Sequence, residues 1–355
     1  MKVAEDALLE VDNLRTQFDT PGGLLTAVDG VSFSLSKGKS LGVVGESGSG
    51  KSVMSRSIMR LLPKVNIQTE GTVRFKSRNL MELAPRDLRK LWGPEMAMIF
   101  QDPLGSLNPV VKVGKQVAEG LRVHSGFSKK EARSEALKLL REVGISEPER
   151  RLDEYPHQFS GGMRQRIVIA IALACQPDLL IADEPTTALD VTVQAQILDL
   201  IEEQRNQRNM SLILVTHDLG VVAGRTDEIM VMYAGRIVER APTKVLFANM
   251  KMPYTEALLE SIPKLERPSH SHLLSIPGQP PNMVDAPHGC KFASRCKYVQ
   301  DRCMEEEPEL IPAATPGHLY RCFFPVGSAE SADALARNMA NGKVDESGSR
   351  VHIRT

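Results

Sequence analysis

The sequence predicts an α/β fold whose core is a parallel sheet covered by helices. Two short apolar runs, residues 179–182 and 212–216, have the length of buried strands, and the amphipathic run 191–208 lies between them. A strand, a helix and a second strand in that order are typical of a parallel sheet. A third apolar run, residues 41–44, ends in a glycine-rich loop. We therefore expect ligand-binding loops at the edge of this sheet.

The N-terminal part predicts an antiparallel sheet ahead of the core. Residues 8–18 and 26–35 alternate apolar and polar side chains around Pro21-Gly22-Gly23, which indicates two strands joined by a turn. The elements expected after the glycine-rich loop are a helix over residues 53–62, ended by Pro63, and strands over residues 71–75 and 96–100.

The middle of the chain predicts an all-helical insert. Helical spacing covers residues 109–124 and 129–143, and Gly144 is placed as a C-terminal cap. Beyond the parallel strands, residues 228–239 predict a hairpin that turns at Ala234-Gly235, and residues 253–261 predict one more helix.

Composition indicates an ordinary globular chain without a global charge. Of its 355 residues, 42% are apolar and 25% are charged, and 44 Lys and Arg balance 44 Asp and Glu. This balance disfavours binding to nucleic acid or to an anionic membrane through a basic tract. The longest apolar stretches, such as residues 167–175, are far shorter than a membrane span, and the first residues lack the apolar core of a signal peptide. We therefore expect a cytoplasmic protein without transmembrane helices.

The chain divides into a main domain, a small module and a tail. We place the main domain at residues 1–262, with its helical part at about residues 103–165. Residues 263–327 are rich in proline and hold four of the five cysteines, which predicts a separate small module. Residues 328–355 are rich in Ser, Ala, Gly and Asp and contain few large apolar side chains, so we expect a flexible tail.

The glycine-rich loop is the most informative segment. Its glycines let successive backbone N–H groups point into one concavity, and the positive end of the following helix adds to the attraction for phosphate. Lys51 can reach the β- and γ-phosphates of a nucleotide, and the Ser52 hydroxyl can ligate Mg²⁺. The loop therefore predicts binding of ATP or GTP. The residues predicted to bind the nucleotide are Gly45, Ser47, Gly48, Ser49, Gly50, Lys51 and Ser52.

Two adjacent carboxylates, Asp183 and Glu184, end the apolar run 179–182. Asp183 suits Mg²⁺, and Glu184 can face an attacking water near the γ-phosphate and act as a general base. His217 follows the next predicted strand and can contact the γ-phosphate, although a single histidine after a strand is more often a surface or core residue. These residues predict the second half of a nucleotide-hydrolysis site.

Ser160-Gly161-Gly162-Met163-Arg164-Gln165, about twenty residues before the acidic pair, resembles the signature sequence of the ATP-binding cassette (ABC) ATPases. Ser160 can cap a helix there, and the amides of Gly161 and Gly162 remain able to bind phosphate. Many family members have Gln where this chain has Met163, and the Ser-Gly-Gly amides are unaffected by that change. The resemblance covers roughly residues 8–260. It implies a P-loop NTPase fold with a RecA-like parallel core, an antiparallel β subdomain and an α-helical subdomain.

The resemblance implies a role for each matching residue. Glu184 corresponds to the catalytic base, His217 to the switch histidine, and Gln101 to the glutamine that relays the nucleotide state to membrane partners. Asp190 belongs to the stretch that matches the D-loop, and Phe18 corresponds to the aromatic residue that stacks on adenine. The Mg²⁺ ligands implied are Ser52, Gln101 and Asp183.

The resemblance also implies partners. In the family, two cassettes pack head to tail, so that ATP binds the phosphate loop of one chain and Ser160, Gly161 and Gly162 of the other. The second cassette is expected to be a related chain, and hydrolysis opens the pair and drives a transporter's alternating access. The further partners implied are two transmembrane permease subunits and an extracytoplasmic peptide-binding protein, with no nucleic acid. The chain is expected to be peripheral, at the cytoplasmic face of the cell membrane.

The remaining motif consists of Cys290, Cys296, Cys303 and Cys322, separated by five, six and eighteen residues. A reducing cytoplasm disfavours disulfides, and the close cysteine pairs usual for zinc are absent, whereas iron–sulfur clusters accept wider spacings. The chemistry alone leaves zinc, a cluster and free thiols open. The segment resembles the C-terminal extension of the oligopeptide and dipeptide importer ATPases through Ala286-Pro287, the Phe-Ala-x-Arg-Cys stretch and the run Glu305-Glu306-Glu307-Pro308. Some of those proteins bind a four-iron, four-sulfur (4Fe-4S) cluster, so the resemblance implies such a cluster on these four cysteines.

These resemblances imply the ATP-hydrolysing subunit of a di- or oligopeptide importer. Relatives with the same extension also serve nickel, glutathione and sugar uptake. An alternative is a soluble ABC ATPase that acts on DNA or ribosomes, but Gln101 and Ser160 lie only 59 positions apart, which leaves no room for the long coiled coil of repair cassettes. A third hypothesis is that the chain is chiefly a redox-sensing or structural module, with the cluster as its purpose and weak ATPase activity.

Overall fold

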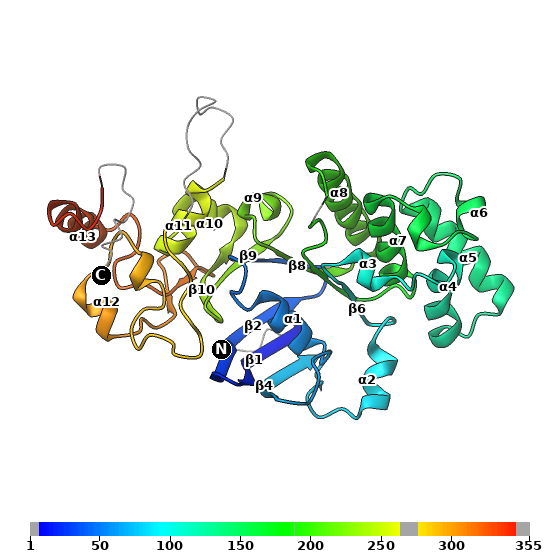
Figure 1. Cartoon of the computed structure of the whole chain (residues 1–355), viewed down its shortest axis with the longest axis horizontal. Coiled ribbons are helices and arrows are strands. Elements are labelled where there is room, and N and C mark those ends of the chain that lie inside the picture. Colours follow the sequence, from blue (N-terminus) through cyan, green and yellow to red (C-terminus); the bar gives the residue numbers. More distant parts are fainter. Residues whose placement is uncertain (1–6, 188, 263–275, 346–355) are drawn as a thin grey trace. The chain divides into compact units, whose positions relative to one another are not determined.

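The computed structural model describes residues 7–187, 189–262 and 276–345 (Figure 1). These residues belong to two compact units. The first unit is drawn from Met1–Glu10, Ser34–Ser40 and Val73–Val215, and the second from Val11–Phe33, Leu41–Thr72 and Thr216–Thr355. The residues after 275 thus share a unit with the glycine-rich loop, so the compact units do not follow the boundary that composition suggests at residue 262.

A four-stranded sheet near the N-terminus has the order β2-β1-β4-β5. Its strands are β1 (Ala7–Thr20), β2 (Gly23–Ser36), β4 (Ile67–Phe75) and β5 (Arg78–Asn79). Buried side chains alternate with exposed ones along much of β1 and β2, as the alternating sequence predicts. The two long strands and the turn between them are confirmed. The short helix α2 (Pro85–Leu91) was not predicted.

Three parallel strands form the sheet of the first unit, in the order β6-β7-β8. They are β6 (Met96–Ile99), β7 (Leu179–Asp183) and β8 (Ser211–Thr216), and every residue of β7 and β8 is buried. Ile99 lies opposite Ala182 and Asp183 lies opposite Val215, so the carboxyl ends of these strands meet at one edge. The predicted helix 191–208 is confirmed as α8 (Val191–Arg208), with Asp190 as its N-cap and Asn209 as its C-cap.

The helical insert is confirmed, and every regular element between residues 103 and 173 is a helix (Figure 1). The elements are α3 (Pro103–Ser106), α4 (Val113–His124), α5 (Lys129–Glu142), α6 (Pro148–Arg151), the 3₁₀ helix η1 (Pro156–Gln158) and α7 (Gly161–Leu173). A capping box of Ser128 and Glu131 begins α5, and Gly144 follows its end with φ +75°. Helices α4, α5 and α7 pack against one another.

The second unit is built on β3 (Ser40–Val44), which pairs in parallel with β9 (Glu228–Tyr233). Strand β10 (Arg236–Pro242) returns antiparallel to β9 through Ala234 and Gly235, both at positive φ, as in a tight hairpin turn. Two short strands from the C-terminal part, β12 (Leu319–Tyr320) and β11 (Ile311–Pro312), extend this sheet beyond β10. The helices of this region are α1 (Lys51–Ile58), α9 (Leu219–Val222), α10 (Thr243–Asn249) and α11 (Pro253–Glu260).

The C-terminal part differs from the predicted tail. Residues 329–340 form helix α13 (Ala329–Ala340), because Ser328 caps it and Ala334 is fully buried on its inner face. Its Asn338 side chain donates hydrogen bonds to the carbonyl oxygens of Lys297 and Val299, both at 2.9 Å. The expected flexible tail is therefore wrong for this stretch, and residues 346–355 lie outside the described residues. Two short elements precede α13, the 3₁₀ helix η2 (Ala293–Arg295) and α12 (Asp301–Glu305).

Among the described residues, no helix has both the length and the apolar character that crossing a membrane requires.

Candidate functional site

The glycine-rich loop connects β3 to α1, and two of its glycines have no room for a side chain. A Cβ on Gly45 would lie 2.2 Å from the carbonyl oxygen of Met232, and one on Gly50 would lie 2.3 Å from that of Ala27. Gly50 has φ +98° and Gly48 has φ +80°, in the left-handed region that favours glycine, although the space beside Gly48 is open. The backbone shape of this turn therefore depends on glycine, as a phosphate-binding loop requires.

Lys51 begins α1, and its side chain folds over the loop. It is buried, and its Nζ donates hydrogen bonds to the carbonyl oxygens of Gly45 at 2.7 Å and Glu46 at 2.9 Å. The predicted serines of the loop are exposed at Ser47, buried at Ser49 and half-buried at Ser52. The structure thus gathers the predicted lysine, serines and backbone amides at the positive end of α1, where phosphate binding is favoured.

Glu46 is held by groups from the C-terminal part of the second unit. Its carboxylate accepts hydrogen bonds from Nη1 of Arg295 at 2.6 Å and Nη2 at 2.8 Å, and its backbone N–H donates to the Tyr254 hydroxyl at 2.7 Å. Burial opposes the charged form of Arg295, but hydrogen bonds to Glu46 and Tyr233 outweigh that effect, and the pKa of the guanidinium is raised. The phosphate loop is therefore also attached, through the charged contact of Glu46 with Arg295, to the C-terminal part of the unit.

Gln101 and Glu184 come from the carboxyl ends of the neighbouring strands β6 and β7. Nε2 of Gln101 and Oγ1 of Thr187 each donate to Oε2 of Glu184, both at 3.0 Å. Glu184 has φ +47°, and its N–H donates to the Val215 carbonyl at 3.0 Å. A glutamate in this backbone region is strained, and such strain occurs at functional sites. These two donors hold Oε2 of the carboxylate in a fixed position, and a general base must be positioned in this way.

The remaining predicted residues of the nucleotide site occupy different environments. Asp183 is fully buried as the last residue of β7, Phe18 is half-buried within β1, and His217 is exposed directly after β8. The Asp190 carboxylate accepts a hydrogen bond from the N–H of Val193 at 3.0 Å and caps α8. Asp190 thus has a helix-capping role that the sequence analysis did not anticipate.

The Ser-Gly-Gly motif begins α7. Oγ of Ser160 accepts a hydrogen bond from the N–H of Met163 at 3.4 Å, which confirms its capping role. A Cβ on Gly162 would lie 2.7 Å from Cγ1 of Val193, so this glycine lets the start of α7 approach the start of α8. Ser160 and Gly161 are exposed. One glycine of the motif therefore serves packing, while the residues before it stay accessible to a ligand.

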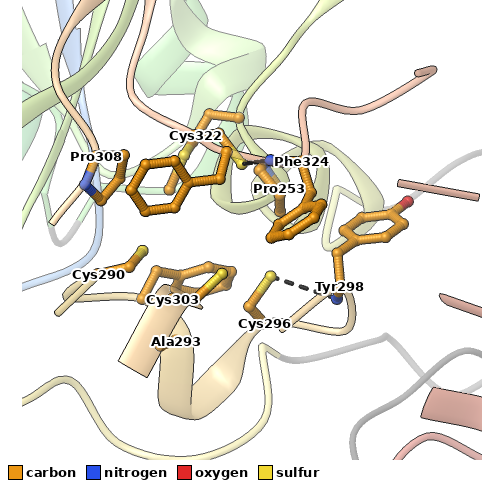
Figure 2. A pocket seen from close by; sticks show the side chains of 12 residues that line it. Pro253, Cys290, Ala293, Cys296, Tyr298, Cys303, Pro308, Cys322 and Phe324 are labelled. Carbon is orange, nitrogen blue, oxygen red and sulfur yellow. Dashed lines mark hydrogen bonds between the residues drawn. The ribbon is translucent and has the colours of Figure 1, made fainter. Parts of the chain in front are cut away.

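The cysteine segment, residues 290–322, brings four thiols around one small cavity (Figure 2). Sγ of Cys296 accepts a hydrogen bond from the N–H of Tyr298 at 3.4 Å, and Sγ of Cys322 accepts one from the N–H of Phe324 at 3.3 Å. The cysteines share the cavity wall with apolar and aromatic side chains that include Phe292, Tyr298, Pro308, Phe323 and Phe324. The tertiary structure therefore collects all four cysteines of the predicted module.

Burial keeps these thiols protonated in the metal-free chain. It raises the pKa of Cys290 to about 11 and that of Cys322 to about 12, and it also raises the pKa values of Cys296 and Cys303. Neighbouring thiols add to the effect on the pKa of Cys296. Within residues 7–187, 189–262 and 276–345, no group of three or more His, Cys, Asp or Glu side chains is arranged to hold a single metal ion.

Two further features of the site were missed by the sequence analysis. Thr187 contacts Glu184 from three positions later, and a hydroxyl at that spacing from a catalytic acid was a usable signal. The contact between Glu46 and Arg295 spans 249 positions in the chain, and no local pattern signals it.

Comparison with known families finds two matches. The family model for the ABC transporter matches residues 28–187, and the model for the oligopeptide/dipeptide transporter C-terminal region matches residues 238–303. Together they cover the glycine-rich loop, the acidic strand and three of the four cysteines of the cysteine segment.

Curated relatives are similar over nearly the whole chain. A dipeptide transport ATP-binding protein of Bacillus subtilis is 52% identical over 328 residues, covering 92% of this chain and 97% of that protein. An oligopeptide transport ATP-binding protein of Salmonella typhimurium is 47% identical, with 90% and 95% covered. A probable peptide ABC transporter ATP-binding protein of Sinorhizobium fredii is 50% identical, with 90% and 95% covered.

Solved structures resemble the fold over about two thirds of the chain. The dimeric structure of a bacterial ABC transporter cassette has a TM-score of 0.60 and 27% identity, and it covers 66% of this chain and 98% of that one. The same scores and coverage apply to a dimeric cassette in a post-hydrolysis state bound to ADP and phosphate.

Proposed function

The chain belongs to the ATP-binding cassette transporter family, and we propose that it is the ATP-hydrolysing subunit of a di- or oligopeptide importer. The observation that carries the peptide assignment is the sequence identity of about 50% to peptide-transport ATP-binding proteins, along both the cassette and the C-terminal region. A cassette that served DNA repair or translation would not require the C-terminal region that this chain shares with peptide transporters.

The glycine-rich loop binds the phosphates of Mg²⁺-ATP. Its amides and the helix α1 dipole attract the anion, and Lys51, already placed over the loop, contacts the β- and γ-phosphates. Mg²⁺ would be held by Ser52, Gln101 and Asp183, and Phe18 would stack on the adenine ring. Hydroxyl, amide and carboxylate oxygens are the ligands that this hard cation prefers.

Glu184 is the general base of the hydrolysis. Its carboxylate accepts a proton from the attacking water, while Gln101 and Thr187 hold one of the two carboxylate oxygens, Oε2, in place. His217 contacts the γ-phosphate and senses its loss. The role of these residues is to position water and stabilise charge, because phosphoryl transfer needs little covalent chemistry from the protein.

A second cassette completes each nucleotide site. Ser160, Gly161 and Gly162 of one chain approach the nucleotide of the other, and Asp190 belongs to the same head-to-tail contact. The exposure of Ser160 and Gly161 at the start of α7 supports this assignment, because an accessible helix N-terminus attracts phosphate. Two permease subunits and an extracytoplasmic peptide-binding protein complete the importer, and the chain lies at the cytoplasmic face of the membrane.

The four cysteines hold a 4Fe-4S cluster in this proposal. Their convergence on one cavity, the N–H···S hydrogen bonds at Cys296 and Cys322, and the apolar wall all suit an iron–sulfur centre. A cluster is held by thiolates that lie farther apart than the ligands of a single ion, so it is compatible with the lack of a single-ion site in the described residues. When bound, a cluster supplies a covalent link across the segment and a one-electron redox centre.

Uptake of labelled peptides by the reconstituted importer tests the function. The chain is co-expressed with candidate permease and cassette subunits, purified and placed in vesicles with a peptide-binding protein. ATP-dependent accumulation of di- or oligopeptides, and not of nickel, glutathione or sugars, is the expected result. Recovery of nucleic acid or ribosomal subunits in place of permeases would contradict the proposal.

Iron analysis of anaerobically purified protein tests the cluster. We expect about four iron and four sulfide per chain, with visible absorbance near ~400 nm from thiolate–iron charge transfer. Replacement of Cys296 by Ser is expected to lower both, whereas replacement of Cys175, which lies outside the cysteine segment, leaves them unchanged. Zinc without iron, or neither metal, would contradict the assignment.

A further inference from the structure

An ion pair between a buried arginine and a half-buried glutamate connects the cysteine segment to the phosphate loop. The Arg295 side chain is only 2% exposed, and its guanidinium binds both carboxylate oxygens of Glu46 in a two-pronged contact at 2.6 and 2.8 Å. Such charge-assisted, bidentate contacts fix geometry as well as contribute energy. Glu46 follows Gly45 directly, so the contact acts on the first turn of the loop that cradles phosphate.

Arg295 itself is held from several sides. Its Nε donates to the carbonyl oxygen of Pro277 at 2.8 Å, Nη2 donates to that of Ile276 at 3.2 Å, and Nη1 donates to the Tyr233 hydroxyl at 3.3 Å. The guanidinium also lies 5.9 Å from the ring centres of Tyr233 and Phe292. The donors of the guanidinium are committed to these partners and to Glu46. The position of the Glu46 carboxylate is therefore set by the fold around Arg295.

Arg295 lies on the same short turn as two of the cysteines. It ends η2, which begins after Cys290 and is followed directly by Cys296. The N–H of Ala293 donates to the Cys290 carbonyl at 2.9 Å, and the N–H of Cys296 donates to the Ala293 carbonyl at 3.3 Å. A change in the backbone of this turn therefore moves the guanidinium and the thiols together.

Glu46 is fixed at three points. Arg295 holds its carboxylate, the Tyr254 hydroxyl accepts from its N–H at 2.7 Å, and Lys51 donates to its carbonyl oxygen at 2.9 Å. Lys51 is also the residue that contacts the nucleotide phosphates in the proposed function. Its hydrogen-bond partner, the Glu46 carbonyl, and the carboxylate that Arg295 holds belong to the same residue. The position of Glu46 thus affects both the loop amides and the lysine.

We propose that Arg295 is a positioning residue for nucleotide binding, and that the cysteine segment and the ATP site are thermodynamically coupled through the Arg295–Glu46 pair. The proposal rests on the proposed function, in which residues 45–52 bind ATP. Because coupling between two sites is reciprocal, an intact cysteine segment strengthens ATP binding, and bound ATP stabilises the turn that carries Cys290 and Cys296.

Nucleotide affinity in full-chain variants provides the first test. Glu46→Gln and Arg295→Gln each remove the charge from one partner, and both are expected to raise the Kd and KM for Mg²⁺-ATP about tenfold, within the usual range for coupled sites. Because Glu184 is untouched, kcat is expected to change less than about twofold. The double variant is expected to bind no more weakly than either single variant, because the pair is already broken. Arg295→Lys is expected to restore part of the affinity by supplying the charge without the planar fork.

Lys297→Gln is the matched control. Lys297 lies two residues from Arg295 and also forms ion pairs, with Glu256 at 3.2 Å and Glu260 at 3.1 Å, but these partners belong to α11 rather than to the loop. Its nucleotide affinity is expected to equal that of the wild type. An equal loss of affinity in Lys297→Gln and Arg295→Gln would overturn the proposal, because general weakening of the segment would then explain both.

Hydrogen exchange provides a readout that does not depend on turnover. In the wild-type chain, Mg²⁺-ATP is expected to slow exchange of the amides of residues 290–296, and Glu46→Gln is expected to abolish that slowing while the protein remains folded. A wild-type chain that binds no nucleotide contradicts the proposed function itself. Nucleotide binding that is equally tight in the wild type, Glu46→Gln and Arg295→Gln contradicts only the coupling, as does unchanged exchange in the wild type on ATP binding.

Discussion

The phosphate loop and the cysteine segment belong to the same compact unit, yet they gather their functional groups over very different lengths of chain. The loop places its lysine, serines and amides within eight consecutive residues, and its glycines allow the backbone conformation that the loop needs. The cysteine segment draws four side chains from a stretch of 33 residues with little regular structure. The first arrangement is encoded locally, whereas the second exists only when the unit is folded. Substitutions in the phosphate loop and in the cysteine segment are therefore expected to have different consequences.

Of the substitutions considered, Glu184→Gln is expected to have the largest effect, and the property affected is the rate of ATP hydrolysis. Removing a general base lowers kcat by about 10²–10⁴-fold, while nucleotide binding and the fold persist because Gln keeps the shape and the contacts to Gln101 and Thr187. Single-turnover hydrolysis and nucleotide binding in the assembled importer measure the two properties. Undiminished steady-state hydrolysis would falsify the assigned role.

The glycines of the loop allow a matched pair of substitutions. Gly50→Ala forces a Cβ to within 2.3 Å of the Ala27 carbonyl oxygen and displaces the loop, so we expect nucleotide affinity to fall about 100-fold. Gly48→Ala has the same kind of positive φ but open space around it, so its loss is expected to stay near tenfold. Binding of a fluorescent ATP analogue measures both. Equal losses at the two positions would show that backbone strain, rather than close approach, makes the glycines necessary.

The cysteine segment is expected to respond to pH through its thiols. Because burial raises the pKa of Cys290 from its usual 9.0 to about 11, its thiolate fraction at pH 8 is about 100-fold lower than in an unfolded chain. Alkylation of the cluster-free protein at pH 8 is therefore expected to be about 100-fold slower at Cys290 than in the urea-denatured chain, as measured by mass spectrometry. Equal rates in the two states would show that the segment does not fold without its ligand.

The raised pKa values of the thiols also determine how the stability of the cysteine segment changes with pH. A raised thiol pKa means that the neutral form is stabilised, so this contribution is complete below about pH 9 and is lost as pH rises through the folded pKa values of about 11 for Cys290 and about 12 for Cys322. The cluster-free segment is thus expected to unfold in this alkaline range. An unfolding midpoint that does not vary between pH 8 and pH 11 would contradict it.

Removal of Asn338 is expected to have the smallest effect and to act on the fold alone. Its side chain satisfies the carbonyl oxygens of Lys297 and Val299, so Asn338→Ala is expected to lower the free energy of unfolding by about 1–3 kcal/mol without changing kcat. Chemical denaturation of the isolated chain measures it. Asn341→Ala, at an exposed position just beyond α13, is the control, and an equal loss there would indicate that α13 itself, rather than its contact to the cysteine segment, is weakened.

Much of the fold could be predicted because the signals are local. The strands β1, β2, β7 and β8, the helix α8 and the helical insert follow from periodicity, apolar runs and caps that lie within each element. Short elements such as α2 and α10 were missed, since a run of seven residues carries little periodic signal. The composition around helix α13 is poor in large apolar residues and therefore predicts a flexible tail instead of a helix. The stability of α13 comes from a small buried alanine and from Asn338 contacting another segment.

The sequence by itself determined the phosphate loop, the acidic strand and the Ser-Gly-Gly helix start, because in each of them the functional atoms belong to residues that are neighbours in the chain and share one backbone conformation. Only the tertiary structure decided that Gln101 and Thr187 bind one oxygen of Glu184, that four irregularly spaced cysteines line one cavity, and that Arg295 holds Glu46. Contacts of this kind depend on how distant elements pack, and the last of them joins residues 249 positions apart. No local conformational preference specifies a contact between residues so far apart in the chain. Burial and hydrogen bonding in the folded unit specify it instead.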